Sequence, residues 1–156
     1  MSMQDLEKAF ELIELNNDKA DFEGPKPEEL ILKAEQALGF TFPPTYRRFL
    51  SHLGCGGFGG TEIYGAITDE FSDSGIPDAI WLTLRKRHDE NNPSSLIIIA
   101  ETGDGGDYAI DCSRFTDESE NPIVEWWSPD QIIVDSANDF GEFFLQRIQE
   151  VLNRFE

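Results

Sequence analysis

The stretch GCGGFGG, from Gly54 to Gly60, raises the question whether the chain binds a nucleotide or only bends sharply there. Its five glycines include the nucleotide-binding spacing G-x-G-x-x-G. A dinucleotide-binding loop follows a strand and precedes a helix, so that the phosphates rest on the helix N-terminus. Here the order is reversed: the helical pattern of residues 44–53 precedes the glycines, and the strand-like run TEIYG follows them. We therefore predict that the glycines supply positive φ angles for a helix-to-strand reversal, with Phe58 as its hydrophobic anchor.

The sequence before the glycines predicts three helices. Apolar residues recur at intervals of three and four over residues 4–15, 30–38 and 44–53. Pro27 suits the first turn of the second helix, because proline lacks the backbone N–H that is unpaired there in any case. The polar segment 16–26 is predicted to be a loop.

The sequence after the glycines favours β-structure. Residues 66–75 form a polar, acidic loop, and 77–87 have the spacing of a helix, with a strand as the alternative. The Ile-rich segment 95–112 predicts a hairpin around GDGGD, and PIVEWW at 122–127 predicts another strand.

The C-terminal segment predicts a long helix. A short apolar run at 132–134 is followed by Ser136 and Asp139, which have the spacing of a capping box, and by a stripe of apolar residues from Phe140 to Phe155. Together the elements predict an α+β fold, a mostly antiparallel sheet with helices packed around it, in a single domain over residues 1–156.

The charge of the chain restricts its partners. Asp and Glu number 31 against 12 Lys and Arg, which gives a formal net charge of −19. Nucleic acid is excluded as a partner, because phosphates are bound by basic stripes that this chain lacks. The charge indicates either solubility or attraction to a basic protein. With no signal peptide or membrane span in the sequence, we expect a cytoplasmic protein.

The sequence contains no recognisable catalytic, cofactor or metal motif. Cys55 and Cys112 are expected to be reduced thiols, and they form no metal-ligand spacing with His52 and His88. Cys55 follows His52 closely, but its place in a glycine bend favours a structural role over a nucleophilic one. We therefore expect a protein that is not an enzyme, with a carboxylate-based hydrolase as the weaker alternative.

Four carboxylates cluster around the predicted hairpin loop, and they raise the question of Ca²⁺ binding. Their spacing does not match an EF-hand, and Asp and Gly are common in tight turns without any metal. We therefore predict no metal site from this cluster, which consists of Glu101, Asp104, Asp107 and Asp111.

Trp126 and Trp127 are adjacent, so on a strand they point to opposite faces. One ring can lie in the core. The other is either covered by a helix or loop, or exposed as an aromatic anchor for a partner.

Four segments, in the same order, resemble the SUKH superfamily. The run ILKAEQALGFTFPPTYRRFLSHLGCGGFGGTEIYG resembles its signature, LIIIAETGDGGDYAIDCS its hairpin, PIVEWW the next strand and SANDFGEFFLQRI its closing helix. The resemblance covers about residues 31–148 and leaves the first helix outside. It implies an α+β fold and a cytosolic immunity protein that neutralises a toxin, often a nuclease. Eukaryotic relatives include cell-wall assembly regulators.

The resemblance and the charge together predict an immunity protein that occludes the active site of a basic, nuclease-type toxin. The alternative is a regulatory or scaffolding module without a toxin. The oligomeric state stays open. Predicted contacts with the partner are the acidic residues of two loops and the tryptophan pair: Asp69, Glu70, Asp73, Asp104, Asp107, Trp126 and Trp127.

Overall fold

The computed structural model describes residues 2–116, 119–128 and 130–155; the predicted domain also includes residues 1, 117–118, 129 and 156, which lie outside the described residues. Its helices are α1 (Ser2–Leu15), the short 3₁₀ helix η1 (Asn17–Lys19), α2 (Glu28–Leu38), α3 (Pro44–His52), α4 (Ala79–Asp89) and α5 (Phe140–Arg154). Its strands are β1 (Ala20–Phe22), β2 (Gly56–Phe58), β3 (Thr61–Ile63), β4 (Leu96–Glu101), β5 (Asp107–Asp111), β6 (Ile123–Trp127) and β7 (Ile132–Ala137).

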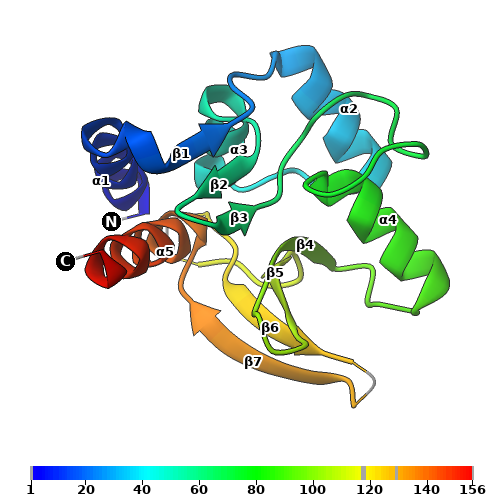
Figure 1. The fold of residues 1–156 in the computed structure, drawn as a ribbon. Helices are drawn as coiled ribbons and strands as arrows, with labels where there is room; N and C mark the ends of the chain where they lie inside the picture. Colours follow the sequence, from blue (N-terminus) through cyan, green and yellow to red (C-terminus); the bar gives the residue numbers. More distant parts are fainter. Residues whose placement is uncertain (1, 117–118, 129, 156) are drawn as a thin grey trace.

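The strands form two antiparallel sheets (Figure 1). The small sheet has the order β1-β2-β3 and the larger one β4-β5-β6-β7. The predicted α+β fold is therefore confirmed, although the β-structure is divided between two sheets. A hydrogen bond from the Tyr64 N–H to the Ile99 carbonyl, 2.7 Å, joins the end of β3 to β4.

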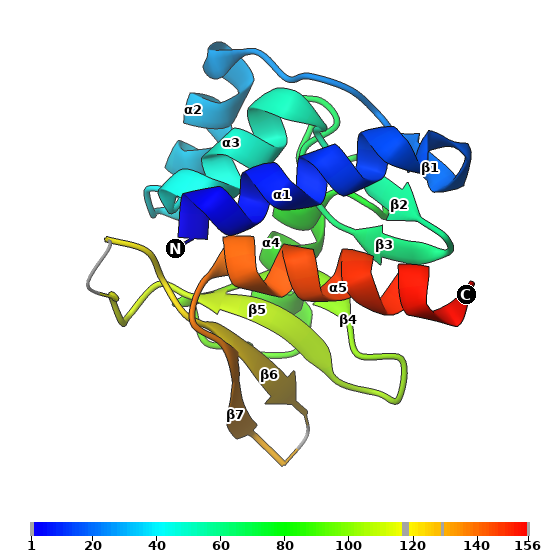
Figure 2. The same ribbon diagram turned by 90° about the vertical axis from the view of Figure 1, so that its left-hand side faces the viewer.

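Helices cover both faces of the larger sheet. The α4 residue Lys86 pairs with Asp107 of β5 at 2.7 Å, whereas the α5 residue Phe143 packs on Tyr108 with ring centroids 4.9 Å apart. Because adjacent strand residues point to opposite faces, α4 and α5 lie on opposite sides of β5. Figure 2 shows α1 and α5 side by side across the molecule. Within the described residues, none of the helices combines the length and the apolar composition needed to cross a bilayer.

A cluster of buried aromatic rings holds α3 and α5 together. Tyr46 and Phe49 of α3 lie 5.0 and 5.2 Å from the Phe140 ring, and Phe49 lies 5.2 Å from Phe144. The Tyr46 hydroxyl donates a 2.8 Å hydrogen bond to the Tyr64 carbonyl, which ties the cluster to the strand side. Buried aromatic rings contribute much of the packing energy of a core, so this cluster fixes how α5 packs on α3.

The structure confirms the predicted helices and hairpin and differs at the N-terminal loop. Residues 16–26 contain η1 and β1, not only a loop. Strand β1 has only three residues, Ala-Asp-Phe, too few for a recognisable pattern, and it is paired with the glycine strand β2, Asp21 opposite Gly57 and Phe22 opposite Gly56. Short strands depend on such a partner, which local sequence does not identify.

The predicted capping box of the last helix is wrong in its position. Ser136 lies in β7, and the N-cap residue is Asp139, whose side chain accepts a 2.9 Å hydrogen bond from the Glu142 N–H. Glu142 in turn accepts from the Asn138 N–H at 2.7 Å. The same capping chemistry therefore operates three residues later, because β7 continues to Ala137 before the helix begins.

Candidate functional site

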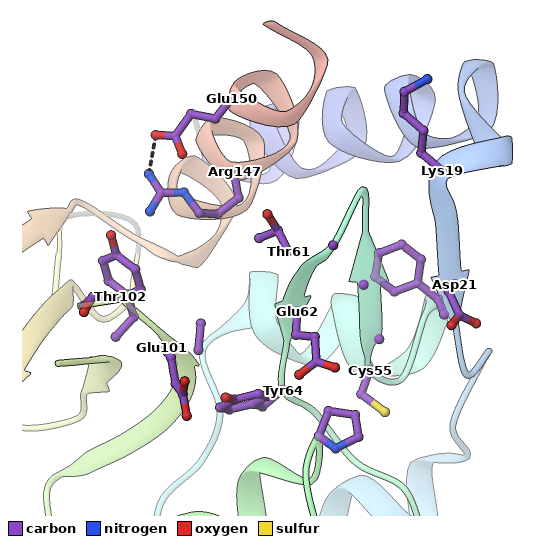
Figure 3. A pocket seen from close by; sticks show the side chains of 18 of the residues that line it. Lys19, Asp21, Cys55, Thr61, Glu62, Tyr64, Glu101, Thr102, Arg147 and Glu150 are labelled. Carbon is purple, nitrogen blue, oxygen red and sulfur yellow. Dashed lines mark hydrogen bonds and ion pairs between the residues drawn. The ribbon is translucent and has the colours of Figure 1, made fainter. Parts of the chain in front are cut away.

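An open cleft of about 980 Å³ lies between the small sheet, the end of β4 and the C-terminal half of α5 (Figure 3). Its walls come from segments distant in sequence. The lining residues are Lys19, Asp21, Phe22, Glu23, Cys55, Gly56, Gly57, Gly60, Thr61, Glu62, Tyr64, Pro77, Ala100, Glu101, Thr102, Gly103, Tyr108, Arg147, Glu150 and Arg154.

The glycine stretch builds one wall of this cleft. A Cβ on Gly56 would lie 2.3 Å from the Asp21 carbonyl oxygen and 2.6 Å from the Phe22 Cα, so only glycine lets β1 approach β2 this closely. The φ angle of Gly56 is also positive, at +144°. Phe58 is buried, as predicted, but the glycines form strand β2 and its turn into β3, not only a reversal after the helix.

Three carboxylates line the cleft without a counter-charge. Asp21 of β1, Glu62 of β3 and Glu101 of β4 are exposed, and none has an ion-pair partner in the part of the chain that the structure describes. The Tyr64 ring lies near Glu62 and Glu101 (Figure 3). Burial, together with the charges of Glu101 and Glu62, raises the pKa of Tyr64 well above its ordinary value. This phenol therefore stays neutral, and its hydroxyl interacts with the Glu101 carboxylate.

The basic side chains of the cleft are engaged within the protein. Arg147 pairs with Glu150 at 2.8 Å and lies over the rings of Tyr108 and Phe143, 5.2 and 5.0 Å from their centroids. Arg154 donates a 3.3 Å hydrogen bond to Thr61 Oγ1. Among the described residues, the cleft therefore has three carboxylates without an ion pair against one such guanidinium, that of Arg154, and this excess of negative charge suits a cationic group.

Cys55 lies at the cleft but does not have the properties of a nucleophile. Both cysteines are free and buried. Burial raises the pKa of Cys55 to about 11 and that of Cys112 to about 12. A thiol with so high a pKa is not ionised near neutral pH. His52 contacts the Phe10 ring, with centroids 4.4 Å apart, as expected for a structural residue.

The buried Cys55 thiol predicts an alkaline loss of stability. Its pKa in the folded state, about 11, lies above the ordinary value of 9.0, so its contribution is complete below pH 9 and disappears as pH rises toward 11. As the pH rises over this range, the free energy of unfolding should fall in both proteins. We expect the fall to be about 2 kcal/mol larger in the wild type than in Cys55→Ala. Urea unfolding at pH 8 and pH 11 measures it. Equal losses in both proteins would contradict the assignment.

The carboxylates considered for Ca²⁺ do not converge. Asp104 accepts a 2.7 Å hydrogen bond from Thr102, and Asp111 pairs with Arg114 at 3.0 Å. Glu101 is directed to the cleft and Asp107 to α4. Among the described residues, no group of three or more His, Cys, Asp or Glu side chains is placed to hold a metal ion.

The acidic residues predicted to contact a partner lie at separate places. Asp69 pairs with Lys33 of α2 at 3.0 Å, and Glu70 and Asp73 are exposed in the same loop. Asp104 is exposed beside the cleft, next to Thr102 and Gly103, which line it.

The prediction that Asp107 lies at the tip of the hairpin is wrong. Asp107 begins β5, is only 8% exposed and pairs with Lys86 of α4. Burial raises the pKa of Asp107 more than Lys86 lowers it. The side chain therefore links the sheet to α4 and is not presented to solvent.

The two tryptophans point to opposite faces of β6, as the alternation predicts. Trp126 is buried and donates a 3.2 Å hydrogen bond to Asn92, so its prediction as an exposed contact is wrong. Trp127 is half-buried and donates to Glu125 at 3.1 Å. Its ring covers Gly106, where a Cβ would lie 2.8 Å from the indole. Of the pair, only Trp127 exposes part of its side chain to solvent.

Sequence reasoning did not identify Asp21, Glu62 and Tyr64 as site residues. In a chain with 31 acidic residues, no spacing distinguishes these carboxylates from the others. Glu101 was noticed only as part of the hairpin cluster. The one usable signal is the glycine stretch, because closely approaching backbones often mark a binding surface.

The fold and the cleft define an α+β domain of two antiparallel sheets whose site is suited to binding a cationic group. In a comparison with protein families, the SUKH_5 family model, described as SMI1-KNR4 cell-wall, matches residues 6–149. The chain therefore belongs to the SUKH superfamily. The match includes α1 from Leu6 onward, a helix that the resemblance had left outside. Membership supports a role as an immunity protein or as a protein of the SMI1-KNR4 kind.

Proposed function

We propose that this protein is an immunity protein that neutralises a basic, nuclease-type toxin by covering the toxin's active site, and that it acts by binding and not by catalysis. It would do so in the cytoplasm of the cell that it protects. Family membership supports the general role. The observation that carries the specific proposal is the set of unpaired carboxylates in the cleft, Asp21, Glu62 and Glu101.

The electrostatics favour a basic partner at two length scales. The net charge of −19 attracts a basic protein from a distance and accelerates its association, an effect that salt weakens. At contact, the three carboxylates offer charge-assisted hydrogen bonds to Lys or Arg. A nuclease holds phosphates with Lys and Arg, so carboxylates on this surface can occupy the same groups.

The test measures binding to the product of the neighbouring gene, the natural candidate for a cognate toxin. Wild-type protein is compared with Glu62→Lys/Glu101→Lys. We expect the double reversal to weaken binding about 100-fold and to abolish protection of cells that express the toxin, because two favourable contacts become repulsive. Raising the ionic strength from about 0.05 M to about 0.5 M should weaken wild-type binding as well.

A matched variant separates the cleft from the overall charge. Glu11→Lys/Glu14→Lys changes the net charge equally, but both residues lie on the exposed side of α1, outside the cleft lining. We expect this variant to lose only the salt-sensitive part of the association rate. Equal losses in both variants would remove the cleft from the proposal, and the absence of any complex or protection would reject the neutralising function.

A regulatory or scaffolding role is the second candidate, and the description of the matching family, SMI1-KNR4 cell-wall, favours it. In that case the neighbouring gene would encode no toxin, and expression of this protein would protect no cell. Glu70, Asp73 and Asp104 stay predicted contacts under either function.

A further inference from the structure

Strand β7 is the open edge of the larger sheet and lies on a hairpin that extends away from the helices (Figure 1 and Figure 2). Its six residues span about 20 Å. It pairs with β6 through Ile132 opposite Trp127, Ile133 opposite Trp126 and Val134 opposite Glu125. An edge strand has backbone N–H and C=O groups that point outward and are free to pair with a further strand.

The opposite edge of this sheet is closed by the protein itself. On β4, the Ile98 N–H donates a 2.9 Å hydrogen bond to Thr83 Oγ1 of α4. The neighbouring Ile99 carbonyl accepts the 2.7 Å hydrogen bond from the Tyr64 N–H. The fold therefore satisfies polar groups along β4 with side-chain and backbone partners, and it provides no equivalent cover for β7 among the described residues.

The first three residues of β7 have the composition of an interior strand. Ile132, Ile133 and Val134 are 49, 47 and 45% exposed. Alternation places Ile132 and Val134 on the face of Trp127, and Ile133 on the face of Trp126. A strand that is apolar on both faces is typical of the middle of a sheet. Solvent-facing edges are usually protected by Lys, Pro or a bulge, and here the register shift comes only after Asp135.

The negative charge on the β6–β7 hairpin favours a basic partner. The described carboxylates on the β6–β7 hairpin are Glu125, Asp130 and Asp135, and the hairpin carries no Lys or Arg of its own. Asp135 pairs with Arg114 at 2.7 Å, which leaves Glu125 and Asp130 for a partner. Asp130, in the turn before β7, is exposed and has no ion-pair partner among the described residues. A second copy would bring a further charge of −19 to this surface, which opposes pairing of β7 with itself.

We propose that β7 binds an extended segment of a basic protein, which adds to the sheet as a fifth strand over residues 132–135. The backbone of the segment pairs with the outward groups of β7. Its apolar side chains cover Ile132, Ile133 and Val134, and its flanking Lys or Arg residues reach Asp130 and Glu125. This inference goes beyond the proposed function and does not require the partner to be a toxin, so either can fail without the other.

The test uses synthetic peptides and the full chain. The probe is the extended peptide Lys-Lys-Val-Thr-Val-Thr-Val-Lys-Lys at millimolar concentration. We expect amide hydrogen exchange within residues 132–135 to slow by about tenfold, with chemical-shift changes limited to β6 and β7. A peptide with Glu in place of every Lys, and one with N-methylated backbone amides, should produce no such protection.

Two variants complete the test. Ile133→Lys places a positive charge on the edge and should abolish the protection, whereas Ile76→Lys makes the same change at an exposed residue of the 66–78 loop and should preserve it. No protection at β7, or equal protection by the Glu peptide, would overturn the proposal. A wild-type dimer in sedimentation analysis that Ile133→Lys converts to a monomer would also overturn it, because a second copy would then occupy the edge.

Discussion

Replacing Gly56 with alanine is expected to lower the free energy of unfolding by about 3 kcal/mol or more. Two costs combine. The residue has a φ of +144°, which side chains rarely adopt, and the new Cβ would lie 2.3 Å from the Asp21 carbonyl oxygen. Since that oxygen belongs to the backbone of β1, the clash is relieved only if β1 moves away from β2. Urea unfolding monitored by circular dichroism measures the loss.

Gly60→Ala is the control for this substitution. Gly60 also has a positive φ, +89°, but no atom lies within 4 Å of the position of its Cβ. We expect this variant to lose only about 1 kcal/mol, the cost of the backbone conformation. Equal losses in the two variants would mean that the contact with β1 contributes nothing. Because β1 carries Asp21, Gly56→Ala should also weaken binding of the partner at the cleft.

Glu120→Ala is expected to lower the free energy of unfolding by about 3 kcal/mol. Glu120 is 1% exposed, and its carboxylate accepts hydrogen bonds from the Thr45 N–H at 3.0 Å and the Thr45 hydroxyl at 2.6 Å. It therefore caps the N-terminus of α3, where backbone N–H groups lack helical partners and negative charge is favourable. Its removal leaves two buried donors unpaired. Thermal unfolding measures the loss.

Two further measurements make this prediction specific. Glu14→Ala, at an exposed position of α1, should change stability by less than about 0.5 kcal/mol. A double-mutant cycle of Glu120→Ala with Thr45→Val should give a coupling energy of about 1 kcal/mol or more. If Glu120→Ala costs no more than Glu14→Ala, the cap makes no contribution to stability.

The helices and the β4–β5 hairpin could be predicted because each has a complete local pattern, whereas only the apolar run 132–134 of β7 was apparent. Apolar spacing places α1, α2, α3 and α5, and Gly39 ends α2 with a φ of +85°. The Ile-rich run and the GDGGD turn place the β4–β5 hairpin. By contrast, β1 has only three residues, and its existence depends on pairing with a glycine strand more than 30 residues later. A local pattern contains no information about such a partner.

The sequence by itself determined the class of the fold and the net negative charge, because periodicity and composition are properties of the chain, and the resemblance of four segments pointed to the superfamily. Only the tertiary structure decided which carboxylates act together. Asp107 became part of an internal ion pair, and Asp21, Glu62 and Glu101 came to share one cleft. The tertiary structure also leaves the outer edge of β7 without a partner among the described residues, whereas α4 and Tyr64 hydrogen-bond to β4. These outcomes depend on how distant segments pack. The sequence pattern does not distinguish an acidic residue that gains a counter-charge in the fold from one that stays unpaired.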